Sequence, residues 1–263
     1  MSVNELSGKS MDQSGQDQLI SRFQAARRDS EFAVLEGFHA LKHAIRFKSD
    51  LRAVVTNSLG GLELLAERLA PDVRSAITEV ARAVPYELFE QLSPGDQETG
   101  VIALASRPVI TREMLQVLSH DAPVVLLESP SHLGNIGAVV RVAAAAGAAA
   151  VLTTGSHDPW HPHAIRGSAG LHFAIPVVRT DDYALTGRPL IAIDPDGEDL
   201  DPSSIPSNAV LAFGSERAGL SDELLKRADA RLRIPMEPAV SSLNLATAVA
   251  VVLYAWRLWR AKA

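Results

Sequence analysis

Short apolar runs recur along the second half of the chain, and the first of them is bounded by Pro123 and by Ser129-Pro130. Runs of this length fit strands that are buried on both faces of a parallel sheet. Helical patterns separate several of these runs. Because strands alternate with helices, the sequence predicts an α/β fold with a mostly parallel sheet. The predicted strands are residues 124–127, 149–153, 190–193, 210–213 and 231–234, and the predicted helices are residues 136–146, 222–228 and 243–262.

A smaller α/β unit is predicted in the first half of the chain, over residues 32–104. Its strands are predicted at residues 32–35, 51–56 and 101–105, and its helices at residues 37–47 and 62–69. Residues 1–16 are polar and poor in large apolar side chains, so we expect them to be disordered. The predicted division is a disordered segment (1–16), a small domain (17–106), a linker (107–122) and a second domain (123–263).

Composition restricts the number of domains, the available chemistry and the partners. The 263 residues suffice for one large domain or two small ones, and the absence of cysteine excludes disulfides and thiolate chemistry. The net charge of -6, from 25 Lys and Arg against 31 Asp and Glu, argues against a broad basic surface for nucleic acid. Two local basic clusters are nevertheless present, and solvated helix faces are their alternative explanation. The clusters are Arg22, Arg27 and Arg28, and Lys42, Arg46 and Lys48.

The sequence shows neither an export signal nor a transmembrane segment. Residues 1–18 are polar and lack the apolar core of a signal peptide. The apolar stretch over residues 243–256 is shorter than a transmembrane helix and is followed by Arg257. We therefore expect a cytoplasmic protein without membrane contact.

Three segments of the second half form an ordered set. They are Gly134-Asn135-Ile136-Gly137-Ala138-Val139-Val140-Arg141, then Phe213-Gly214-Ser215-Glu216-Arg217-Ala218-Gly219, then Ser241-Ser242-Leu243-Asn244-Leu245, which follows Ile234-Pro235-Met236. In this order they resemble the three motifs of the SpoU/TrmH family of RNA ribose 2'-O-methyltransferases. The resemblance is strong from about residue 123 to the C-terminus and looser over about residues 32–104.

The loops that follow predicted strands are candidates for cofactor binding, because ligands of open α/β sheets bind at the carboxyl ends of strands. Glycine lets backbone amides approach a ligand closely, and Pro235 fixes its loop without offering an amide hydrogen. The resemblance implies that the ligand is S-adenosylmethionine, held in a trefoil-knotted region largely by backbone contacts. Gly214, Ile234 and Leu243 match the family's cofactor contacts. The full set of cofactor-binding candidates is Thr153, Gly155, Phe213, Gly214, Ile234, Met236, Ser242 and Leu243.

Arg141 is a charge within an apolar helical pattern, six residues after Asn135. The resemblance implies that Arg141 is the catalytic arginine and Asn135 the motif asparagine, although Asn135 is also placed to cap its helix. Guanidinium stays protonated, so an electrostatic role is expected rather than that of a base. It would hold the adjacent phosphate and stabilise charge on the attacking 2'-oxygen, while phosphate or water accepts the proton. The catalytic candidates are Arg141, Asn135, Glu216, Ser242 and Asn244.

Structural roles compete with some of these assignments. Ser242 and Asn244 are both placed to cap the C-terminal helix, and we expect at least one of them to do so. Glu216 is placed to pair with Arg217 or Arg141. The family usually has a small residue after this glutamate. Arg217 departs from that pattern and is expected to narrow the RNA cleft or to contact phosphate.

A histidine-rich loop offers candidate metal ligands. His157, Asp158, His161 and His163 are suitable ligands, but three other residues interrupt them and no helical pair of histidines is formed. We therefore expect no metal. The following run, residues 166–170, resembles a small-residue segment of the family, for which close backbone packing is expected before a strand at residues 173–177.

Two other functions remain as alternatives. Gly134 and Gly137 suggest a nicotinamide-dependent oxidoreductase, but the dinucleotide pattern needs three glycines after a strand and a downstream acid, and the spacing here fails. A non-catalytic RNA-binding protein of the same fold would be expected to lack Arg141 or Asn244, and both are present. The sequence favours the methyltransferase.

The resemblance also implies partners. The substrate would be structured RNA, either rRNA or tRNA, which the small domain helps to select; rRNA is preferred because two-domain members often act on it. Family members are homodimers that use the C-terminal region and donate an arginine to the partner's site. Exposed tryptophan is common at interfaces, so Trp256 and Trp259 are expected contributors. The sequence identifies neither the RNA nor the nucleotide.

Overall fold

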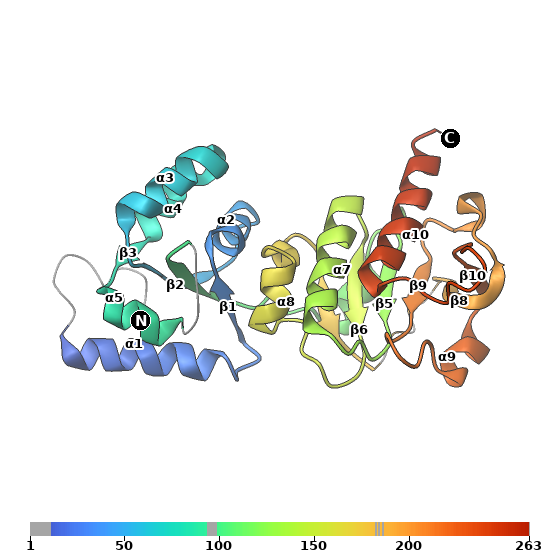
Figure 1. Cartoon of the computed structure of the whole chain (residues 1–263), viewed down its shortest axis with the longest axis horizontal. Helices are drawn as coiled ribbons and strands as arrows, with labels where there is room; N and C mark the ends of the chain where they lie inside the picture. Colours follow the sequence, from blue (N-terminus) through green and yellow to red (C-terminus); the bar gives the residue numbers. More distant parts are fainter. Residues whose placement is uncertain (1–11, 94–98, 182, 184, 186, 263) are drawn as a thin grey trace. The chain divides into compact units, whose positions relative to one another are not determined.

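The computed structural model describes residues 12–93, 99–181, 183, 185 and 187–262. The chain divides into two compact units (Figure 1). The first contains residues 1–108 together with residues 160–173, and the second contains residues 109–159 and 174–263. The second unit therefore encloses, in sequence, a short segment that packs with the first.

The first unit is built on a four-stranded sheet with the strand order β1-β4-β2-β3. The pairs β1/β4 and β2/β4 are antiparallel, and β2/β3 is parallel. The three strands predicted here are confirmed within one residue. The strands are β1 (Phe32–Glu36), β2 (Leu51–Thr56), β3 (Arg82–Ala83) and β4 (Val101–Ser106), and the helices are α1 (Gln13–Ala26), α2 (Phe38–Arg46), α3 (Leu59–Leu69), η2 (Pro71–Val73), α4 (Arg74–Val80), α5 (Tyr86–Leu92), α8 (Pro162–Gly167) and η3 (Leu171–Phe173).

The helix α1 overturns part of the predicted disordered segment. Residues 1–11 lie outside the described residues, but residues 13–16 form the first turn of α1, and the Asp12 side chain caps that turn by accepting from the Gly15 N–H. Leu19 and Phe23 of the same helix are buried in the core against the sheet. The polar first turn is thus helical because a capped and partly apolar helix follows it.

Residues 160–173 pack onto α2 and β1 of the first unit. Arg166 forms an ion pair with the buried carboxylate of Glu36, and the Ala169 carbonyl lies 2.7 Å from Nδ1 of His43. A Cβ on Gly170 would lie 2.7 Å from the Cα of Ala40, so the close backbone packing expected for residues 166–170 is present. The strand predicted at residues 173–177 is wrong, because a 3-10 turn occupies residues 171–173 and the strand begins at residue 177.

The second unit is built on a six-stranded sheet with the strand order β10-β8-β9-β5-β6-β7, and every neighbouring pair is parallel. This confirms the predicted α/β fold with a parallel sheet. The three central strands are buried along their whole length, as their continuous apolar sequences require. The strands are β5 (Val124–Leu127), β6 (Ala150–Thr153), β7 (Val177–Arg179), β8 (Leu190–Asp199), β9 (Val210–Phe213) and β10 (Ala230–Arg233).

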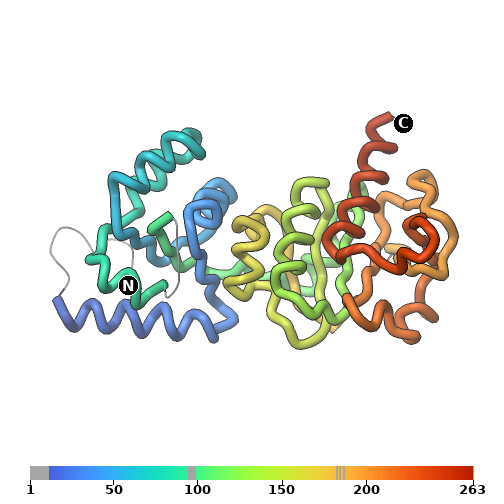
Figure 2. The backbone as a smooth tube through the Cα atoms, in the orientation of Figure 1, coloured from blue at the N-terminus to red at the C-terminus, as the bar shows by residue number. Residues whose placement is uncertain are grey.

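The strand register brings several carboxyl ends to one level. Leu127 pairs with Thr153 and with Phe213, and Phe213 pairs with Ile193. The loops after β5, β6 and β9 therefore leave the sheet side by side, and β8 leaves its pairing with β9 at the same level, after Ile193. Helices α7 and α10 lie next to each other against this sheet, and the backbone trace runs from β10 through residues 234–244 into α10 (Figures 1 and 2). The helices of this unit are α6 (Arg112–Gln116), α7 (Leu133–Ala146), η4 (Pro202–Ser204), α9 (Asp222–Arg227) and α10 (Leu245–Arg260).

Candidate active site

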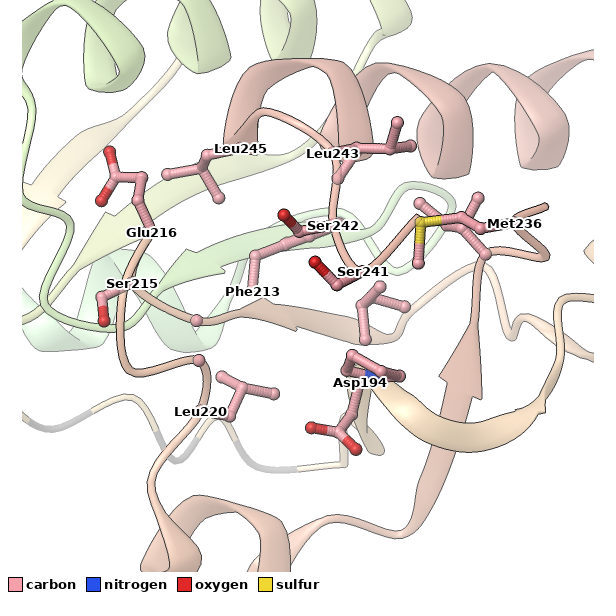
Figure 3. Close-up of a pocket in the computed structure, with 16 residues that line it drawn as sticks. Asp194, Phe213, Ser215, Glu216, Leu220, Met236, Ser241, Ser242, Leu243 and Leu245 are labelled. Carbon is pink, nitrogen blue, oxygen red and sulfur yellow. The ribbon is translucent and has the colours of Figure 1, made fainter. Parts of the chain in front are cut away.

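A pocket with a volume of about 150 Å³ lies at the carboxyl ends of β9 and β10, next to the middle of β8 and beside the first turn of α10 (Figure 3). This is the position that parallel α/β sheets offer to ligands. Its walls are mostly apolar, and Asp194 and Glu216 are the charged residues among the described residues that line it. The lining residues are Ile193, Asp194, Pro195, Phe213, Gly214, Ser215, Glu216, Gly219, Leu220, Ile234, Met236, Ser241, Ser242, Leu243, Leu245 and Ala248.

Most of the residues predicted to bind a cofactor meet in this pocket. The six that line it are Phe213, Gly214, Ile234, Met236, Ser242 and Leu243. The other two lie elsewhere in the second unit. Thr153 is fully buried, and its hydroxyl has no hydrogen-bond partner within the described part of the chain. Gly155 has a φ of 80°, and a Cβ there would lie 3.0 Å from Oγ of Ser129, so packing between loops accounts for this glycine.

The loop after β9 closes on itself through backbone contacts. Ser215 and Gly219 exchange two hydrogen bonds, of 3.0 and 3.1 Å between N and O atoms. A Cβ on Gly214 would lie 2.0 Å from the carbonyl carbon of Gly219, a distance that no side chain tolerates. Gly214 is therefore required for the close approach of residues 214 and 219–220, and this approach forms part of the pocket wall.

The carboxylate of Glu216 joins the first two sequence motifs. Its Oε2 accepts from the Ser131 N–H at 2.9 Å and from Oγ of Ser131 at 2.7 Å, while its Oε1 accepts from Nδ2 of Asn135 at 2.7 Å. Residues 216 and 135 are 81 positions apart in sequence. The pairing of Glu216 with an arginine is thus not what the structure shows, because its oxygens are occupied by Ser131 and Asn135.

These hydrogen bonds fix the charge of Glu216. Burial by itself would raise the pKa of this carboxyl group. Hydrogen bonds from the Ser131 and Asn135 side chains and from the Ser131 N–H outweigh that effect and lower the pKa from 4.5 to about 2. The group is therefore ionised at neutral pH and cannot serve there as a proton donor. Its role is to anchor the loop of residue 131 and the side chain of Asn135.

Asn244 joins the third motif to the other two. Its Nδ2 donates to Oδ1 of Asn135 at 3.0 Å, and its Oδ1 accepts from the N–H groups of Ala246 and Thr247. Asn244 is thus the N-cap of α10, which confirms the prediction that Ser242 or Asn244 caps this helix. Asn135 does not cap α7, which begins at Leu133 after the N-cap His132. Its amide instead bridges Glu216 and Asn244.

Arg141 is exposed on α7 and makes no hydrogen bond or ion pair with any described residue. It is not among the residues that line the pocket. Arg217 is also exposed and unpaired over the described ranges, next to Glu216. The single chain therefore assembles Asn135, Glu216 and Asn244 but leaves both arginines available to a further molecule.

Sequence reasoning missed two features of the pocket. Ser131, which holds Glu216, carries no motif signal, since its pairing spans 85 residues. Ile193, Asp194 and Pro195 line the pocket where the strand predicted at residues 190–193 was expected to end. The rule that ligands bind at the carboxyl ends of parallel strands applies to this strand as well, and would have found them.

The donor set restricts the ligand chemistry. No described lysine, arginine or histidine lines the pocket, so a pyrophosphate would meet carboxylates rather than cations. Apolar walls, close backbone and two carboxylates suit an uncharged or cationic adenosine derivative better. Within the described residues, no three His, Asp or Glu side chains converge to hold a metal ion, and no helix has the length and apolar character needed to cross a bilayer.

Comparison with known proteins assigns the family. Residues 122–254 match the model of the SpoU rRNA Methylase family, and the chain belongs to this family. It is similar to the 23S rRNA (uridine(2479)-2'-O)-methyltransferase of Streptomyces viridochromogenes, with 28% identity over 241 residues that cover 86% of this chain and 82% of the relative. It is also similar to the 23S rRNA (guanosine(2553)-2'-O)-methyltransferase RlmP of Bacillus subtilis, with 32% identity over 84% of this chain and 86% of the relative.

The fold agrees with this assignment over nearly the whole chain. A solved crystal structure described as an RNA 2'-O ribose methyltransferase superposes with a TM-score of 0.74 and 28% identity. The match covers 96% of this chain and 98% of that structure. The likeness therefore extends over both units.

Proposed function

We propose that this protein transfers a methyl group from S-adenosylmethionine to the ribose 2'-hydroxyl of a nucleotide in structured RNA, with rRNA as the substrate. The observation that carries the proposal is the hydrogen-bonded chain Glu216–Asn135–Asn244, which unites three motifs from distant parts of the sequence at the edge of one pocket. Family membership and the 2'-O-methyltransferase names of the relatives point to the same reaction.

The pocket residues fit S-adenosylmethionine. Phe213, Ile234 and Leu243 offer apolar surface for an adenine ring, and the tight backbone at Gly214 leaves room for a flat ligand. When bound, the cofactor supplies an activated methyl group on a sulfonium. The absence of cations among the described lining residues suits this cationic ligand and disfavours a nicotinamide dinucleotide. Thr153 and Gly155 stay predictions as cofactor contacts.

Arg141 is proposed to act on the substrate rather than on the cofactor. Its guanidinium would hold an RNA phosphate beside the reacting ribose and stabilise the negative charge that develops on the 2'-oxygen. Phosphate or water then takes the proton. Because Arg141 does not line the pocket of its own chain, we place it at the site of a partner subunit.

A homodimer would bring that arginine to the pocket. The helix α10 exposes a stripe of apolar side chains, Val251, Tyr254 and Leu258, at spacings of three and four residues, and Leu258 is 60% exposed. Trp259 is exposed beside them. The prediction that Trp256 contributes through exposure is wrong, because this side chain is 5% exposed and packs within its own chain. The unpartnered stripe supports a second copy of the chain as its occupant.

The names of the relatives support rRNA as the substrate class but leave the nucleotide open. One relative is named for a uridine and the other for a guanosine of 23S rRNA. We propose a cytoplasmic protein without membrane contact or metal, and the trefoil knot stays a prediction from the family.

The test is methylation of defined RNAs. Protein would be incubated with S-adenosylmethionine and transcripts of 23S rRNA or of tRNAs, and nucleosides would be quantified by mass spectrometry. A 2'-O-methylnucleoside in rRNA that disappears with Arg141→Ala is expected. Methyl groups on a base, or no methylation although the cofactor binds, would overturn the reaction, and methylation of tRNA alone would overturn the substrate.

A further inference from the structure

The pocket contains a carboxylate that the proposed mechanism does not use. Asp194 lies in β8, directly after the last residue that pairs with β9, and on the opposite side of the pocket from Glu216, with Phe213 between them in this view (Figure 3). The catalytic candidates Asn135 and Asn244 gather on the Glu216 side, so the proposed reaction belongs to that side. The side with Asp194 is therefore left for the part of the cofactor that does not react, which is its adenosine.

A strand irregularity presents Asp194 to the pocket. β10 pairs with β8 at Ala192 and resumes at Glu198, so residues 193–197 bulge out of the ladder. A Cβ on Gly197 would lie 2.7 Å from the backbone of Arg231, which means that the end of the bulge is pressed against β10. Bulges of this kind redirect side chains, and they are frequent beside active sites.

The two pocket carboxylates differ in how their oxygens are used. Both oxygens of Glu216 are occupied by Ser131 and Asn135. Asp194 accepts one hydrogen bond, from the Asp196 N–H to Oδ1 at 3.0 Å. Its Oδ2 has no partner in the portion of the chain that the structure describes. Asp194 is thus held in place by one oxygen while the other is free to accept a hydrogen bond from a ligand.

We propose that Asp194 binds the ribose hydroxyls of the cofactor's adenosine, which rests on the proposed use of S-adenosylmethionine. A carboxylate only accepts hydrogen bonds, and the vicinal hydroxyls of a ribose are its natural donors. The same pairing of an acidic side chain with a ribose hydroxyl occurs in dinucleotide-binding sheets. Asp194 is therefore a specificity-determining residue for a ribonucleoside cofactor, and it leaves the transferred methyl group to the other side of the pocket.

The experiment combines substitutions in the protein with removal of the ribose hydroxyls from the ligand, as in a double-mutant cycle. Titration calorimetry would measure the affinities of S-adenosylmethionine, S-adenosylhomocysteine and the 2',3'-dideoxy form of S-adenosylhomocysteine. The proteins would be the wild type, Asp194→Ala, Asp194→Asn and the control Asp196→Ala. Asp196 is exposed in the same bulge and does not line the pocket, and its backbone N–H survives the substitution.

Asp194→Ala is expected to weaken both hydroxyl-bearing ligands by about tenfold, which is about 1.4 kcal/mol. The dideoxy ligand should lose less than about twofold, because it has no hydroxyl to lose, and Asp196→Ala should change no affinity by more than that. Asp194→Asn keeps an oxygen for the Asp196 N–H, so it should show the same pattern with the bulge intact.

Two results would overturn the inference. Equal weakening of all three ligands by both Asp194 variants would mean that Asp194 only shapes the bulge. A loss confined to S-adenosylmethionine would mean that Asp194 senses the sulfonium charge instead of the ribose. Failure of the wild-type protein to bind any of the three ligands would refute the proposed function itself, and with it the basis of the inference.

Discussion

The substitution Glu216→Gln tests whether the hydrogen-bonded chain of the three motifs holds the second unit together. The carboxylate accepts three hydrogen bonds, two from Ser131 and one from Asn135. A glutamine retains one acceptor oxygen and replaces the other by a donor. If the amide nitrogen takes the place of Oε2, it faces the Ser131 N–H. If it takes the place of Oε1, it faces Nδ2 of Asn135, which cannot turn without losing Asn244.

The expected loss in the free energy of unfolding follows from these contacts. At least one hydrogen bond to a charged acceptor is lost, and such bonds contribute roughly 1.5–3 kcal/mol. Because Glu216 is only partly buried, we discount this to about 1–2 kcal/mol of the free energy of unfolding. For a chain of this size the melting temperature should fall by about 2–8 °C.

The pH dependence of stability gives a second, independent test of the role of Glu216. The folded pKa of Glu216 is lowered from 4.5 to about 2, so its stabilisation is present above pH 4.5 and is lost as the pH falls toward 2. The difference between wild type and Glu216→Gln should therefore be constant from pH 7 to about 5 and shrink below that.

The assay is urea unfolding followed by circular dichroism at several pH values. The control is Glu198→Gln, an exposed carboxylate without a hydrogen bond or ion pair to described residues. The reasoning is refuted if Glu216→Gln has the same free energy of unfolding as the wild type at pH 7, or if the control loses as much stability.

Three further outcomes are expected. Arg141→Ala should lower kcat by roughly 10²- to 10³-fold with S-adenosylmethionine affinity kept, measured by single-turnover methylation and calorimetry; near-normal turnover would remove the arginine from the reaction. Gly214→Ala should abolish measurable cofactor binding because its Cβ would lie 2.0 Å from a backbone carbon, whereas Gly134→Ala, with no atom within 4 Å of the new Cβ, should leave the melting temperature equal or higher. The double substitution Tyr254→Glu and Leu258→Glu should yield monomers in sedimentation at micromolar concentration, and a dimer that persists would exclude the α10 stripe as the interface.

The sequence predicted the sheet of the second unit well, for a physical reason. Strands 124–127 and 210–213 were predicted to the residue because both faces are buried, so that every position must be apolar. Strand 190–193 was predicted at its start, but its extension to Asp199 was missed. The extension is polar and exposed, and its pairing with β10 is interrupted, so hydrophobic pattern does not reveal it.

In the site, the sequence predicted the residues that belong to the motifs but not the residues that contact them. Phe213, Gly214 and Leu243 meet in the pocket because the segments that follow β9 and β10 lie at one edge of the sheet. The partners of Glu216 were missed, because contacts across 81 and 85 residues depend on the folded backbone. Thr153 is fully buried and does not line the pocket, so its assignment as a cofactor contact stays a prediction.

The packing of residues 160–173 with the first unit determines where this protein can be recombined with its relatives. A chimera joined at residue 108 would take the first unit without the segment that supplies Arg166 to Glu36 and seats Gly170 against Ala40. The exchangeable module is therefore discontinuous in the gene. An exchange of the whole first unit would have to carry residues 160–173 along with residues 1–108, as two inserts rather than one.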